Sequence, residues 1–158
     1  WLPGFKPQVG DDGGCFAAAL ASVRRWGGVI EHPAGSAAWA EFGMPKPDID
    51  GQWSEPDDGG GRSCHVEQAQ YGHKARKATW LYAVGVDFPQ LRWGSTPGDF
   101  TAPSGNKRAG MVSQMSKRDR AATPHAFRDV LISIAKSATI RPDGGIESWP
   151  AGAGDTPA

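Results

Sequence analysis

The chain has 158 residues, of which 39% are hydrophobic, and its 17 basic side chains balance 17 acidic ones. This length is enough for one domain with a core, whereas the zero net charge excludes an overall positive field that would attract nucleic acid. With only two cysteines, the chain has no disulfide framework, which favours a reducing cytoplasm. No apolar run reaches the roughly 20 residues of a membrane span, so we expect no membrane partner.

A helix is expected first, over about 13–26, with an aspartate at 11 or 12 as its cap. Apolar side chains recur at helical spacing along it: Phe16, Ala19, Leu20 and Val23. Two glycines, Gly27 and Gly28, end this helix. The short apolar run that follows them fits a buried parallel strand near 28–31.

The middle of the chain alternates loops and strands. Ser36 is expected to cap a short helix that ends near Phe42, and the Pro-, Gly- and Asp-rich stretch 43–62 to form a mobile surface loop. A strand is expected at 64–70, where polar and apolar residues alternate. Another is expected at 78–84, which is rich in β-branched and aromatic residues.

The last element is a helix near 124–137, which Thr123 and Pro124 open. These elements predict an α/β fold in which a small, partly parallel (mixed) sheet is flanked by helices and joined by long Gly/Pro-rich loops. We expect one domain over 1–138 and a disordered tail over 139–158, where Gly, Pro, Ala and Asp dominate.

Glu31 is the first candidate for a functional residue. It stands at the carboxyl end of a predicted strand, where ligands bind in open α/β sheets. A carboxylate there can act as a general acid or bind a substrate, or it can be a solvent-facing or helix-capping group. His32 follows it and either shapes the same pocket or satisfies backbone groups.

The second candidate is a basic turn between two predicted strands. Its bend holds Tyr71 and His73, followed by Lys74, Arg76 and Lys77. Such cations can hold phosphates, which supply most sequence-independent affinity for DNA. The alternative is a solvated hairpin with ordinary surface charge.

Other chemistry has less support in the sequence. The spacing of Cys64, His65 and His73 matches no zinc site, so we expect no metal. Cys15 is expected to pack in a helix rather than act as a nucleophile. Three tryptophans in or near loops are candidates for stacking on a base: Trp39, Trp53 and Trp93.

Three segments together resemble the downstream half of DNA cytosine-5 methyltransferases of the phage and prophage type. Residues 29–39 resemble that family's "IENP…S…W" segment, and 71–81 are similar to its "fGH…K.T.LW" segment. Residues 117–127 resemble the arginine and Thr-Pro entry to the family's final helix. These matches cover about a quarter of the chain.

The resemblance implies an incomplete Rossmann-like methyltransferase domain that acts on DNA with S-adenosylmethionine as cofactor. Glu31 would contact the Watson–Crick edge of a flipped base, and His32 stands where the family has Asn. The turn that holds Tyr71, His73, Lys74, Arg76 and Lys77 would lie near the DNA. The glycine-rich cofactor motif and the Pro-Cys nucleophile segment are absent from this sequence.

Two alternatives remain open at this point. The chain is either catalytically inactive alone, with a missing N-terminal methyltransferase half as partner, or a DNA-binding module without chemistry. The module would use six cations: Lys74, Arg76, Lys77, Lys117, Arg118 and Arg120. An unrelated small α/β protein is the third possibility.

Overall fold

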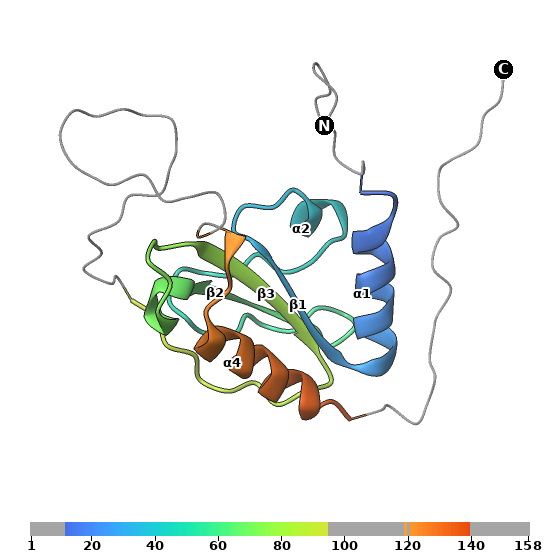
Figure 1. Ribbon diagram of the computed structural model, residues 1–158. Helices are drawn as coiled ribbons and strands as arrows, with labels where there is room; N and C mark the ends of the chain where they lie inside the picture. Colours follow the sequence, from blue (N-terminus) through green and yellow to red (C-terminus); the bar gives the residue numbers. More distant parts are fainter. Residues whose placement is uncertain (1–11, 95–118, 120, 140–158) are drawn as a thin grey trace, which may run out of the picture.

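The computed structural model describes residues 12–94, 119 and 121–139. In this part of the chain, helices lie on both sides of one small sheet (Figure 1). The elements follow one another as α1 (Cys15–Trp26), β1 (Gly28–Pro33), α2 (Ala38–Glu41), β2 (Arg62–Glu67), the 3₁₀ helix η1 (Gln68–Tyr71), β3 (Ala78–Val84) and α4 (His125–Lys136). No helix among these residues is long and apolar enough to cross a membrane.

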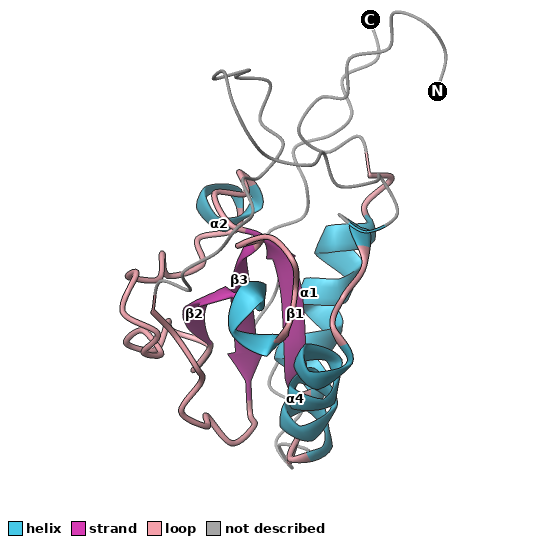
Figure 2. Cartoon of the chain, turned by 60° about the vertical axis from the view of Figure 1, so that its left-hand side comes forward, coloured by secondary structure: helices cyan, strands magenta, loops and turns pink. Residues whose placement is uncertain are grey.

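The sheet has the order β1-β3-β2, and β3 is antiparallel to both of its neighbours (Figure 2). The α/β class is confirmed, but the expectation of a partly parallel sheet was wrong, because no two adjacent strands among the described residues are parallel. The physical reason is the short connection over 68–77: parallel neighbours need a crossover of about a dozen residues or more. Since β3 lies between them, β1 and β2 nevertheless run in the same direction.

The element boundaries agree with the periodicity of the sequence in most places. Both long helices lie within two residues of their expected limits, and the strand at 78–84 is confirmed. The strand expected at 64–70 ends earlier, at Glu67, because the chain turns into η1 at Gln68. The N-cap residue of α1 is Gly14 rather than the expected aspartate. The Asp12 carboxylate nevertheless accepts the backbone N–H groups of Gly14 and Phe16, at 3.0 and 2.7 Å.

Alternating side chains of the strands build two cores, one on each face of the sheet. On the α4 face, Leu81 and Ala83 pack with Phe127 and Ile134. On the face that α1 and α2 cover, the buried side chains are Leu20, Ile30, Trp39, Met44, Tyr82 and Val84. Because β3 is buried on both faces, its sequence is an almost continuous apolar run.

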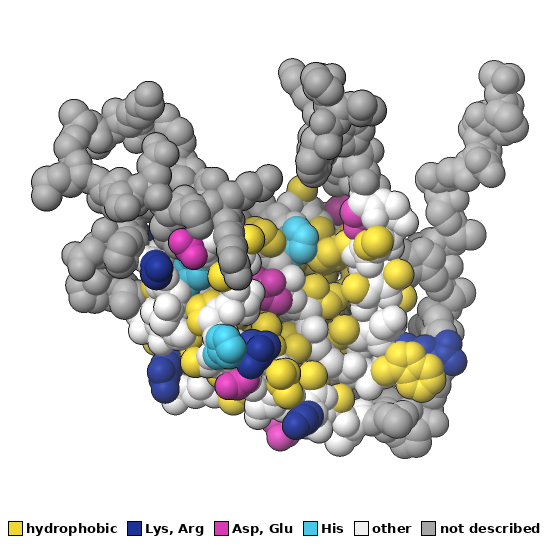
Figure 3. Space-filling model, in the orientation of Figure 1, with side chains coloured by type: hydrophobic (Ala, Val, Ile, Leu, Met, Phe, Trp, Pro, Cys, Tyr) yellow, Lys and Arg dark blue, Asp and Glu magenta, His cyan; other side chains and the backbone are white. Residues whose placement is uncertain are grey.

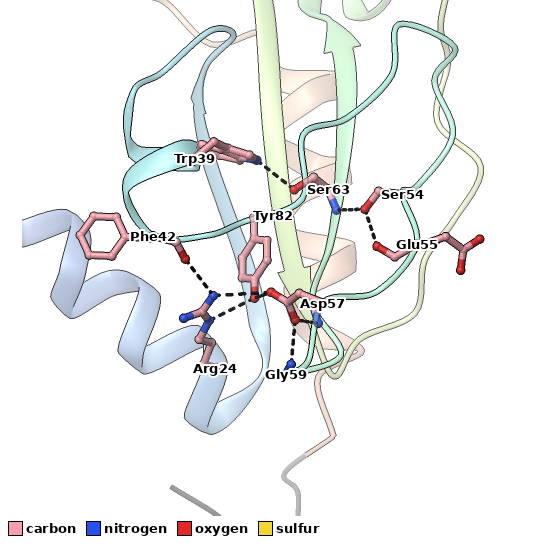
Figure 4. Close-up of polar contacts among 10 residues, drawn as sticks. Arg24, Trp39, Phe42, Ser54, Glu55, Asp57, Gly59, Ser63 and Tyr82 are labelled. Atoms are coloured by element: carbon pink, nitrogen blue, oxygen red, sulfur yellow. Dashed lines mark hydrogen bonds and ion pairs between the residues drawn. The ribbon is translucent and has the colours of Figure 1, made fainter. Parts of the chain in front are cut away.

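The loop between α2 and β2 is fastened to the sheet and to α1 through Asp57 (Figure 4). One carboxylate oxygen accepts the hydroxyl of Tyr82 at 2.7 Å and pairs with Arg24 at 3.5 Å. The other accepts the backbone N–H groups of Gly59 and Gly61, at 2.9 and 2.8 Å. Part of the segment expected as a mobile surface loop at 43–62 is therefore held to the sheet and to α1 by half-buried polar contacts.

Several expectations lie outside the described residues. These are the tail from 140 onward and the three cations Lys117, Arg118 and Arg120. Ala19, which the sequence placed in the buried stripe of α1, is exposed, whereas Leu20 is fully buried.

Candidate functional site

The candidate site lies where β1 and β2 both end. Because the two strands run in the same direction, their carboxyl ends meet at one edge of the sheet, beside the first residues of β3. Glu31, Gln68 and Thr79 come together there from three separate elements. In open, mostly parallel α/β sheets, ligands bind at the carboxyl ends of the strands, and two of the three strands described here end at this edge.

The amide of Gln68 organises this edge. Its nitrogen donates to Oε1 of Glu31 at 3.2 Å and to Oγ1 of Thr79 at 3.0 Å. The Thr79 hydroxyl in turn donates to the carbonyl of Lys77 at 3.1 Å, so it accepts from Gln68. Gln68 and Thr79 are fully buried, whereas Glu31 is half-buried. The Glu31 carboxylate is therefore fixed in orientation.

Two acceptor atoms at this edge lack a partner within the described part of the chain. The Oε1 atom of Gln68 is buried without a hydrogen-bond partner. Only one oxygen of the Glu31 carboxylate, Oε1, has a partner among the described residues. The Gln68 oxygen is enclosed, since Gln68 is fully buried, whereas Glu31 is half-buried. The second carboxylate oxygen of Glu31 can therefore accept a hydrogen bond from a donor group.

His32 does not share this site, although it follows Glu31 directly. Neighbouring residues of a strand point to opposite faces, and the His32 ring packs edge-on against Phe16, with 5.3 Å between ring centroids. Trp39 lies next to the same ring, at 6.4 Å. The structure thus places the two sequence-predicted catalytic residues on different faces of the sheet.

Tyr71 and His73 of the basic turn are both buried. Tyr71 is 7% exposed, packs on Phe127 with ring centroids 5.2 Å apart, and accepts the N–H of Arg92 at 2.8 Å. The buried ring of His73 contacts backbone at both nitrogens: Nδ1 is 3.0 Å from the Ala75 nitrogen and Nε2 is 3.2 Å from the Asp119 carbonyl oxygen. Both rings are suited to positioning this turn.

The three cations of the turn differ in their surroundings. Arg76 forms a bidentate ion pair with the carboxylate of Glu67. Its hydrogen bonds to Glu67 raise the pKa of Arg76. Lys77 donates to the carbonyl oxygens of Ala121 and Ala122, at 3.4 and 2.9 Å. Lys74 and Arg76 are both exposed, but only Arg76 is held by an ion pair with another described residue.

The cysteines and histidines do not gather into one site. Cys64 lies in the core on the α4 face, and burial raises the pKa of its thiol to about 12. His65, the next residue, faces the other side of the sheet and accepts the indole N–H of Trp80 at 3.2 Å. Within the described ranges, no three potential metal-ligating side chains come together. Cys15 is exposed at the start of α1.

Sequence reasoning missed Gln68 and Thr79. Each leaves a faint signal, since Thr79 lies in the otherwise apolar run of strand β3 and Gln68 directly follows the strand β2. Comparisons of the whole chain with protein-family models, with curated proteins and with solved structures found no match. The function proposed below therefore rests on the geometry and on the sequence resemblance.

Proposed function

We propose that this chain is the base-binding part of an S-adenosylmethionine-dependent DNA methyltransferase, in which Glu31 binds the Watson–Crick edge of an extruded base. The observation that carries the proposal is the Glu31 carboxylate, oriented by the buried amide of Gln68 at the edge where β1 and β2 both end. The sequence resemblance assigned the same residue to base contact.

The chemistry of a carboxylate favours bases that carry an exocyclic amino group. Ionised glutamate only accepts hydrogen bonds, and cytosine offers its N4 amino group as a donor. Gln68 occupies one oxygen of Glu31 and leaves the other for the base. An extruded base is commonly recognised by such hydrogen bonds to its Watson–Crick edge. Thymine, which has a carbonyl in place of the amino group, would face the carboxylate with a second acceptor.

The arrangement of elements supports a Rossmann-like domain of which this sheet is one end. Helices cover both faces of the sheet, as in doubly wound folds. The outer edge of β1 has no partner strand among the described residues. Helix α1 leads directly into β1 and packs beside it, which is the place of the crossover helix that would join a preceding parallel strand.

The outer surface of α1 fits the same interpretation. It is formed by small exposed side chains: Ala18, Ala19, Ala21 and Ser22. Such a surface lets another element approach closely. In this proposal, a further methyltransferase half would cover the free edge of β1 and this surface of α1.

The described residues do not fit the methyl donor. A donor site of the Rossmann type needs a glycine-rich turn between a strand and the helix that follows it, whereas Gly27 and Gly28 lie between a helix and a strand. The buried thiol of Cys64 also does not suit an attacking group. We therefore assign neither the donor nor the nucleophile to these residues.

The free thiols of Cys15 and Cys64 agree with a reducing cytoplasm.

A binding experiment tests the role of Glu31. The affinities of the chain for single-stranded oligomers of deoxycytidine and of thymidine, equal in length, are measured by fluorescence anisotropy. We expect deoxycytidine to bind about 5- to 150-fold more tightly, as one good base contact provides. Glu31→Gln should remove this preference, whereas Glu55→Gln, at an exposed loop carboxylate, should retain it. A preference that survives Glu31→Gln contradicts the proposal.

A second function, DNA binding without chemistry, is favoured by the exposed ammonium group of Lys74. Such binding would depend on phosphate contacts and would be lost on charge reversal at Lys74 and Lys77 but not in Glu31→Gln. Figure 3 shows the Lys and Arg side chains of one face spread over it rather than gathered in one patch. The base-binding function is therefore the better supported of the two.

A further inference from the structure

A small cleft lies along the outer side of β2, away from the Glu31 carboxylate. Its volume is about 200 Å³. The residues that line it come from the loop before β2, from β2 itself, from the basic turn and from the segment after β3: Ile49, Gly51, His65, Glu67, Arg76, Trp93 and Gly94. The function proposed above makes no use of this cleft.

One wall of the cleft is apolar and exposed. Trp93 is 51% exposed and Ile49 is 75% exposed. The Trp93 side chain is seated directly on the backbone of Gly51, where an added Cβ would come within 2.3 Å of it. A large flat ring is thus held in place while much of its surface remains open to solvent.

The other two loop tryptophans with the same predicted role are already engaged. Trp39 is 2% exposed, and its indole N–H donates to Ser63 at 2.9 Å. Trp53 is half-buried, and its indole N–H donates to the carbonyl of Pro89 at 2.8 Å. Of the three stacking candidates in the sequence, Trp93 therefore presents the most accessible ring.

Polar groups line the opposite part of the cleft. The Glu67 carboxylate, which is 7% exposed, holds the guanidinium of Arg76 through Nε and Nη2. The Nη1 group of Arg76 has no partner among the described residues, and the side chain is 60% exposed. The guanidinium is fixed in place, and it still offers N–H donors.

We propose that this cleft binds one unstacked base of single-stranded DNA, with the base stacked on Trp93 and Arg76 donating to its edge or to its phosphate. The volume is below the roughly 300–1,000 Å³ typical of drug-sized ligands, and it suits a single small ring system. Aromatic stacking accepts any base, because every base has a π-face. This inference rests on the proposed function, which brings single-stranded or extruded nucleotides to the chain.

Two thymidine oligomers of equal length test the proposal, one intact and one with abasic sugars in place of its nucleosides. Stacking contributes about 1–3 kcal/mol per base, so the intact oligomer should bind about 5- to 150-fold more tightly. Trp93→Ala should abolish that difference and leave the affinity for the abasic oligomer unchanged. Trp26→Ala, which removes an equally exposed tryptophan from α1, is the matched control and should keep the full difference.

The outcomes separate this inference from the proposed function. Equal affinity for the two oligomers, or a difference that Trp93→Ala retains, overturns the stacking site. If Trp93→Ala abolishes the difference while Glu31→Gln leaves the cytosine preference intact, the cleft stands and the proposed role of Glu31 falls. The unfolding midpoint of each variant, measured by circular dichroism, shows that the folded chain was tested.

Discussion

Replacing Tyr82 with phenylalanine tests how the long loop before β2 is fastened. The Tyr82 side chain is fully buried in β3, donates to Asp57 at 2.7 Å and accepts from Nε of Arg24 at 3.2 Å. Without the hydroxyl, the Asp57 carboxylate loses its shortest side-chain partner. A hydrogen bond to a charged group contributes about 1.5–3 kcal/mol, so the free energy of unfolding should fall by about that amount.

For a domain of this size, the loss lowers the melting temperature by roughly 3–12 °C. Differential scanning calorimetry at neutral pH measures it. Tyr71→Phe is the matched control, because among the residues that the structure describes its hydroxyl accepts a single backbone N–H, that of the exposed residue Arg92. Its effect should be smaller. A melting temperature of Tyr82→Phe equal to that of the wild type would refute the account of this network.

Three further predictions follow from the same structure. Burial raises the pKa of Tyr82 from 10.0 to about 12. The folded state therefore holds the phenolic proton more tightly than the unfolded state does. The free energy of unfolding should be constant below about pH 10 and should fall by about 3 kcal/mol as the pH rises through about 12. Urea unfolding at a series of alkaline pH values should show this decline in the wild type and a shallower one in Tyr82→Phe, and equal slopes would argue against it. Gly61→Ala would place a Cβ 2.1 Å from the Tyr82 hydroxyl oxygen, so it should lower the free energy of unfolding by at least about 2 kcal/mol. Gly59→Ala, whose Cβ would meet nothing closer than 3.3 Å, should lower it less. Equal decreases in the two variants, measured by chemical denaturation, would count against the packing described. A thiol reagent in mildly alkaline buffer should modify the exposed Cys15 rapidly and Cys64 only after unfolding, because burial raises the Cys64 pKa to about 12; rapid modification of both thiols in the folded chain would show that Cys64 is accessible.

Local patterns predicted the helices and most strand limits well. The apolar spacing of α1 and α4 and the β-branched and aromatic run of β3 are properties of neighbouring residues, so they are visible in the sequence. The order of the strands is not local. The short connection over 68–77 accounts for the antiparallel pairing of β2 with β3, but nothing in the apolar run of β3 shows that it also pairs with β1.

The candidate site was predictable only in part. Glu31 was singled out because the strand was predicted to end there, whereas β1 continues to Pro33. The alternation of side chains along β1 already implied that His32 points to the other face. Gln68 and Thr79 reach Glu31 only through the pairing of three elements. Tyr71 and His73 were expected near DNA as part of a polar turn, but their hydrogen bonds to Arg92 and Asp119 depend on segments far along the chain.

The most direct test of the central claim is the chemical shift of the Glu31 carboxyl carbon during titration with oligodeoxynucleotides. Its NMR signal is assigned by its absence from the spectrum of Glu31→Gln. The proposed function predicts that the signal moves on saturation with oligodeoxycytidine and moves less with oligothymidine, while the signal of the exposed Glu55 stays in place. A Glu31 signal that stays unchanged at saturating oligodeoxycytidine would contradict the claim that this carboxylate binds the base.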